Sequence, residues 1–138
     1  MSEMNSKEFN EFLSRPLIAS MTTVGIGGLP QVTPIWYEYD GELFHCVFQR
    51  NSVKARNLRR DPRVTLCIAT HDDPYSYVVA GGKCEISVDG VEDLCYSIST
   101  RYLGKKRGRE FAHQSLDTGG MVVLKMRSNK VLAQSHVI

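Results

Sequence analysis

Short β-forming segments separated by turn signals recur along this 138-residue chain, and they limit its fold more than any other feature. The segments are rich in β-branched and aromatic residues, and residues 64–68 carry an apolar side chain at every second position. The glycine-rich run 25–30 and the pair Asp40-Gly41 are typical of hairpin turns, which join antiparallel neighbours. We expect strands at residues 17–24, 31–39, 42–49, 64–70, 75–89, 121–126 and 130–135.

Helical patterns interrupt these strands in only a few connections. A first helix is expected from Asn5 or Ser6 to Arg15, because Phe9, Phe12 and Leu13 recur at helical spacing. A short helix follows residue 52, and two helical segments cover residues 91–103 and 107–116. So few helices argue against a doubly wound parallel sheet, and they favour a small, mainly antiparallel β-barrel of the α+β class.

Two strands contain residues that disturb regular pairing. Pro34 has no N–H to donate, so its strand must have an edge or a break there. Such a break exposes the backbone of Thr33, Pro34 and Ile35 beside Trp36. The pair Gly81-Gly82 predicts a bend in the long strand 75–89.

The composition is that of one folded domain spanning residues 1–138. Hydrophobic residues make up 42%, which is enough for a core, and the net charge of +2 argues against a dedicated nucleic-acid binder. The first 15 residues do not resemble a signal peptide, and no apolar run could span a bilayer. The four cysteines lack metal-ligand spacing, so we expect free thiols, a cytoplasmic location and no metal site.

Positive charge is concentrated in residues 50–63, which hold six of the 17 basic residues and one acidic residue. This stretch carries about +5 formally, so the remainder of the chain sums to about −3. Asn51 or Ser52 can cap a short helix there, Lys54 lies in its first turn, and Asp61-Pro62 ends it. Free amides and a lysine at a helix start can bind phosphate, and the alternative is a solvated basic helix between two strands.

A second basic cluster occupies residues 105–109. It could line a groove for an acidic ligand, such as an acidic substrate or the oligoglutamate tail of a cofactor, or it could be a solvated loop between helices. Because no aromatic residues interleave it in a stacking pattern, a nucleic-acid role is not expected.

Several ordered segments resemble the split β-barrel flavin-binding superfamily typified by pyridoxamine 5′-phosphate oxidase, and most closely its branch that uses coenzyme F420. They are LIASMTT at 17–23, GLPQVTPIW at 28–36, KARNLRRDPRV at 54–64 and the strand 75–85. The resemblance extends from Phe9 to Leu132 and implies a split barrel of six to seven strands. The second phosphate motif and the C-terminal substrate signature of the oxidase are not visible, so pyridoxamine phosphate is not the expected substrate.

The resemblance also implies a homodimer with its cofactor, F420 or alternatively FMN, at the subunit interface. The implied cofactor-binding residues fall on the basic helix and on the proline-broken strand, and no catalytic residue is implied. They are Thr33, Pro34, Ile35, Trp36, Arg50, Ser52, Lys54, Asn57 and Tyr77.

Three functions are compatible with this resemblance. The first is an oxidoreductase that transfers hydride to a small conjugated or heterocyclic substrate, which would lie under the helical segment near residues 96–111. The second is a flavin or F420 carrier or sensor without turnover. The third is a split barrel that handles haem.

Overall fold

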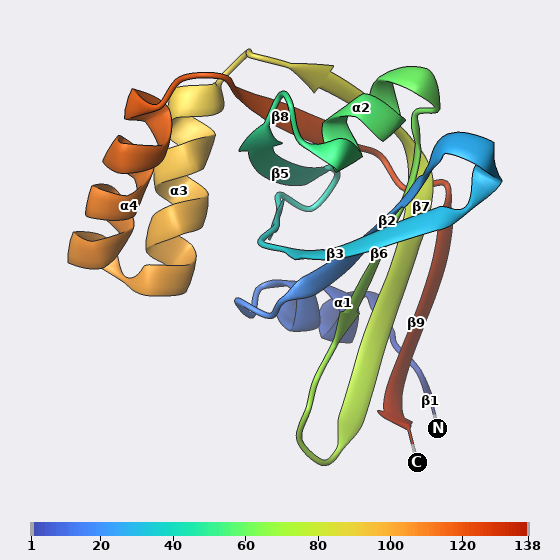
Figure 1. Ribbon diagram of the computed structural model, residues 1–138. Helices are drawn as coiled ribbons and strands as arrows, with labels where there is room; N and C mark the ends of the chain where they lie inside the picture. Colours follow the sequence, from blue (N-terminus) through green and yellow to red (C-terminus); the bar gives the residue numbers. More distant parts are fainter. Residues whose placement is uncertain (1, 138) are drawn as a thin grey trace.

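The computed structural model describes residues 2–137, in which nine strands form one antiparallel sheet that curls into an open barrel (Figure 1). Neighbouring strands follow the order β3-β2-β6-β7-β8-β5-β4, with β9 on β7 and β1 on β9. The α+β split-barrel prediction is confirmed, and the strand number exceeds six to seven partly because β1 and β4 have two residues each. The bounds are β1 Ser2–Glu3, β2 Ala19–Val24, β3 Pro30–Ile35, β4 Glu38–Tyr39, β5 Phe44–Gln49, β6 Arg63–Ala69, β7 Tyr75–Ser87, β8 Met121–Met126 and β9 Lys130–Val137.

The long strand β7 belongs to both halves of the barrel, of which one contains β1, β2, β3, β6 and β9 and the other contains β4, β5 and β8. It pairs with β6 and β9 as far as Lys83 and Gly81 respectively, and from Cys84 it pairs with β8. The change of partner occurs at Gly81-Gly82, where the sequence predicts a bend. Gly82 is needed there because a Cβ on it would lie 2.6 Å from the carbonyl oxygen of Arg127.

Strand β3 forms one end of the sheet and pairs with β2 alone among the described strands. Pro34 lies opposite Ser20, and the strand stops at Ile35 before β4 begins at Glu38. The predicted strand 31–39 is therefore both an edge strand and a broken one. The break places Trp36 between the two halves of the barrel.

Four α-helices connect or cover the strands: α1 Ser6–Leu13, α2 Val53–Arg60, α3 Val91–Leu103 and α4 Lys105–Asp117. Asn5 caps α1 through a reciprocal capping box with Glu8. Ser52 caps α2, which ends at Asp61 before a proline, as the sequence predicts. The second expected helical segment is confirmed as α4, but it starts at Lys105, two residues before the expected start. The second basic cluster therefore lies within the helix and not in a loop.

Helices α3 and α4 form an antiparallel hairpin beside β5 and β8 (Figure 1). The two helices approach closely at Gly108, where a Cβ would lie 2.4 Å from the Cα of Thr100. The end of α3 is tied to α1, since Arg101 donates hydrogen bonds to the carbonyls of Leu13, Ser14 and Arg15. The hairpin therefore has a fixed position against the barrel.

The hydrophobic core fills the barrel between the inward faces of the strands. Its largest fully buried side chains come from β2, β5, β6, β7 and β8, from the break after β3 and from Leu13 at the end of α1. They include Tyr37, Phe44, Met21, Leu66, Ile68, Leu124, Met126 and Val78.

Candidate functional site

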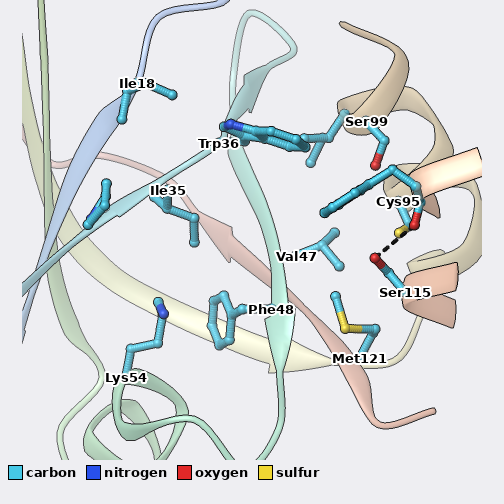
Figure 2. A pocket seen from close by; sticks show the side chains of 13 residues that line it. Ile18, Ile35, Trp36, Val47, Phe48, Lys54, Cys95, Ser99, Ser115 and Met121 are labelled. Atoms are coloured by element: carbon cyan, nitrogen blue, oxygen red, sulfur yellow. Dashed lines mark hydrogen bonds between the residues drawn. The ribbon is translucent and has the colours of Figure 1, made fainter. Parts of the chain in front are cut away.

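A cavity of about 520 Å³, here called cavity A, opens between the end of β3, the strand β5 and the helical hairpin α3–α4 (Figure 2). Its position follows from the break after β3, which leaves a gap between the two halves of the barrel. The side chains that strands and their flanks contribute to its lining are mainly apolar. They are Ile18, Pro34, Ile35, Trp36, Val47, Phe48 and Met121.

Trp36 forms a rigid aromatic wall of cavity A. Its ring stacks on Tyr102 at a centroid distance of 4.9 Å with an interplanar angle of 7°, and Phe111 lies 5.3 Å away. The Tyr102 hydroxyl donates to the carbonyl of Leu17 at 2.7 Å and accepts from the backbone N–H of Tyr37 at 3.1 Å. Because Tyr102 is held at its hydroxyl and Trp36 is stacked on it, the indole can form a preorganised surface for a flat ligand.

Lys54 supplies the cationic side chain of cavity A. Its ammonium lies 5.7 Å from the centre of the Phe48 ring and points into the cavity (Figure 2). Within the described residues it forms no ion pair with a carboxylate. Helix geometry leaves the first-turn N–H groups of Val53 and Lys54 without intrahelical partners, so the helix start adds partial positive charge beside the ammonium.

Arg50 and Ser52 precede the start of α2, and Asn57 lies one turn into the helix. The Ser52 hydroxyl accepts from Ala55 N–H at 3.2 Å and donates to the carbonyl of Gln49 at 2.7 Å. The buried Asn57 donates to Thr23 Oγ1 at 3.1 Å, so it fastens α2 to β2. The backbone of Arg50 donates to a carbonyl in the turn before β8, and its side chain is exposed.

The structure thus brings Pro34, Ile35, Trp36 and Lys54 together in cavity A, with Arg50 and Ser52 beside the start of α2. Tyr77 lies apart, half-buried on β7 in register with Ala69 of β6 and Gln134 of β9. It contributes nothing to the lining of cavity A. The roles of these residues toward a cofactor remain predictions.

The wall formed by α3 and α4 was located only approximately from the sequence. It contributes Cys95, Ile98, Ser99, Phe111 and Ser115, which overlap the predicted region 96–111. Burial raises the pKa of the Cys95 thiol, so this side chain stays neutral. Phe48 and Met121 were missed, because nothing in their local sequence shows that their strands border a gap.

Thr33 provides a test of whether a polar ring system fits beside β3. Its hydroxyl oxygen is buried and has no hydrogen-bond partner within the described residues. A buried hydroxyl normally has a partner, and it lies one residue before the cavity-lining Pro34. Thr33 itself does not line cavity A, so the fit of a flat ligand depends on the apolar lining, the Trp36 ring and the Lys54 ammonium.

The second basic cluster does not form a purely cationic groove. Lys105 and Arg109 line an open groove along the outside of α3 and α4 together with Glu92 and Glu110. Two acidic side chains therefore accompany the two basic ones. This balance gives the groove little preference for an anion.

No three His, Cys, Asp or Glu side chains among residues 2–137 come together in a way that could hold a metal ion. In the same part of the chain, none of the helices combines the length and apolar character needed to cross a bilayer.

Comparison with known proteins supports the split-barrel fold. Residues 6–135 match the family model described as pyridoxamine 5′-phosphate oxidase. Rv2991, a conserved hypothetical protein from Mycobacterium tuberculosis, is 28% identical with a TM-score of 0.81, over 96% of this chain and 86% of that one. A structure named F420 reductase is 26% identical with a TM-score of 0.74, over 88% of this chain and 94% of that one.

The same fold also occurs in a protein named for a different ligand. The heme storage protein HutZ from Vibrio cholerae is 16% identical with a TM-score of 0.68, and the alignment covers 91% of each chain. At that identity the similarity concerns the fold alone. Since the family model spans nearly the whole chain, the protein belongs to the pyridoxamine 5′-phosphate oxidase family.

Proposed function

We propose that this chain is an oxidoreductase that binds a phosphorylated flavin or deazaflavin in cavity A, with coenzyme F420 as the first candidate and FMN as the alternative. The observation that carries the proposal is Lys54, an ammonium without a carboxylate partner in the described residues, at the edge of an apolar cavity. A flat, apolar ring with a phosphate group matches both features. The similarity to a protein named F420 reductase is the reason for placing F420 before FMN.

Different residues of cavity A would hold the phosphate and the ring of such a cofactor. Lys54 and the first-turn amides of α2 would hold the phosphate, because a charged donor and aligned N–H groups favour an anion. Ile35, Trp36 and Phe48 would sandwich the ring and exclude water from it. A bound flavin or deazaflavin supplies the hydride-transfer chemistry, so the protein needs no general base for that step.

The substrate in this proposal is a small conjugated or heterocyclic molecule between the ring and the α3–α4 wall. That wall offers the neutral side chains Ser99, Ser115 and Cys95, and the one charged residue in the lining is Lys54. A neutral, flat acceptor therefore suits the remaining space.

We also propose that the protein acts as a homodimer. One row across the outside of the sheet consists of small and apolar residues in register: Pro34, Ser20, Cys67, Val79 and Leu132. Most of this row is exposed in the single chain, and Leu132 is 50% exposed. A second copy would cover such a face and would lie next to cavity A, which Pro34 also lines.

Light scattering combined with size-exclusion chromatography tests the dimer, and Cys67 provides a second measurement. We expect a two-chain mass, slow thiol labelling of Cys67 at high protein concentration and faster labelling on dilution. Cys67→Arg should give a folded monomer. A wild-type protein that stays monomeric at a few hundred micromolar would contradict the dimer and leave the cofactor proposal standing.

The central experiment is a side-by-side titration of the purified protein with F420 and FMN, followed by fluorescence anisotropy. The absorption spectrum of the purified protein separates the alternatives, because a flavin spectrum indicates FMN and a Soret band indicates haem. Turnover of a panel of enones and quinones with the reduced cofactor then distinguishes an enzyme from a carrier or sensor. Failure of both cofactors to bind at about 100 μM, a concentration that detects binding free energies as weak as about −5.5 kcal/mol, would refute the proposal.

A further inference from the structure

A second cavity, cavity B, has a volume of about 440 Å³ and opens at the other end of the β2–β3 hairpin. Cavity A is lined by Ile35 at one end of β3, and cavity B by Pro30 at the opposite end. Five residues of extended strand separate these positions by about 17 Å. The two cavities share no lining residue.

Cavity B is lined by three cationic side chains and by no carboxylate. Arg63 of β6 and Lys83 of β7 are register partners, and Lys130 opens β9 next to them. Asp61, which lies outside the lining, forms a bidentate ion pair with Arg63: Nε lies 3.0 Å from Oδ1, and Nη2 lies 2.6 Å from Oδ2. Lys83 and Lys130 form no ion pair within the described residues, so most of the positive charge is not neutralised locally.

Neutral hydrogen-bonding groups accompany these charges. Thr22, Thr65 and Gly81 lie in one register row across β2, β6 and β7, and this row ends at Lys130 of β9. Gly81 keeps the floor open, because a Cβ there would lie 3.2 Å from the Thr65 hydroxyl oxygen. Asn129 adds a side-chain amide at the rim, and its backbone N–H is fixed to the Gly81 carbonyl at 3.0 Å.

From this arrangement we infer that cavity B is a binding site for a small phosphate-bearing anion, distinct from the cofactor site in cavity A. Two unpaired ammonium groups and threonine hydroxyls on a glycine-containing floor, with the N–H groups of Arg63 that Asp61 leaves free, are donors of the kind that hold phosphate in proteins. The inference does not depend on the proposed function. The row that forms its floor is adjacent to the apolar row of the proposed dimer, so the site would lie at the rim of that interface.

Isothermal titration with pyrophosphate at fixed ionic strength tests the inference. We expect saturable binding with one site per chain, and the double variant Lys83→Gln/Lys130→Gln should weaken it at least tenfold. The matched control is Lys105→Gln/Lys106→Gln on α4, which removes the same charge elsewhere and should change the affinity less than twofold.

A further titration assigns the site. Lys54→Met should leave pyrophosphate binding unchanged, because Lys54 does not line cavity B. The inference is overturned if the wild type does not bind, if both double variants weaken binding equally, or if Lys54→Met abolishes it. The cofactor proposal is tested separately by the FMN affinity of the Lys83→Gln/Lys130→Gln variant, which should equal that of the wild type.

Discussion

Replacing Lys54 with methionine gives the most direct test of the cofactor site. Methionine retains an unbranched apolar stem over Phe48 and removes the charge. A hydrogen bond to a charged group contributes roughly 1.5–3 kcal/mol, which corresponds to an affinity loss of about 10- to 150-fold. Lost cation–π attraction at a half-exposed lysine amounts to only about 0.5–1 kcal/mol of stability, so the fold should persist.

The assay is a titration of F420 and of FMN into wild type, Lys54→Met and a control, with thermal unfolding measured on the same samples. Arg56→Met is a matched control, because it removes one positive charge from the same helix at an exposed position outside the lining of cavity A. Its affinity should change by less than about threefold, as expected for a screened surface charge. If the wild type binds and Lys54→Met binds equally well, Lys54 does not contact the cofactor and the proposed site is wrong.

Three predictions concern the framework around the site. Tyr102→Phe removes a hydroxyl that bonds two backbone groups, so the free energy of unfolding should fall by about 1–3 kcal/mol, measured by urea denaturation; an unchanged midpoint would contradict this. Gly108→Ala should lower the free energy of unfolding by about 1–3 kcal/mol in the same urea experiment, because the new Cβ would lie 2.4 Å from the Cα of Thr100. An unchanged free energy of unfolding would show that α3 and α4 can separate without cost. A hydrogen bond from the Leu43 N–H, and then one with the His45 imidazole, lower the pKa of Asp40 to about 2. Because the pKa is lower in the folded state, the ionised Asp40 stabilises the fold above pH 3.8, and this contribution is lost as the pH falls toward 2. The wild type should therefore lose stability relative to Asp40→Asn over that range. Equal acid sensitivity in the two proteins would refute that assignment.

Features of the fold that depend on local chemistry could be predicted from the sequence. Ser52 caps α2, and Pro34 marks the end of a sheet, because capping and the missing proline N–H act within a few residues. Gly81-Gly82 marks the change of partner along β7 and could be recognised from the residue type, although the carbonyl of Arg127, which excludes a Cβ at Gly82, is distant in sequence.

The parts that could not be predicted depend on distant contacts. Phe48 and Met121 line cavity A because the barrel stays open between β3 and β5, and hydrophobic alternation describes only which face of a strand is buried. The hydrogen bond from Asn57 to Thr23, which fastens α2 to β2, likewise joins residues far apart in the sequence, and the expected role of Asn57 toward a phosphate stays a prediction. Strand β1 was also missed, since a two-residue pairing leaves no periodic signal.

Strand β7 has a consequence for the energetics of the whole chain. Because it pairs with β6 and β9 along one part and with β8 along the other, neither half of the barrel can open without breaking bonds along this shared strand. The two sides of cavity A should therefore lose structure in a single cooperative transition, and amide protons near the middle of β7 should exchange with solvent only when the entire molecule unfolds.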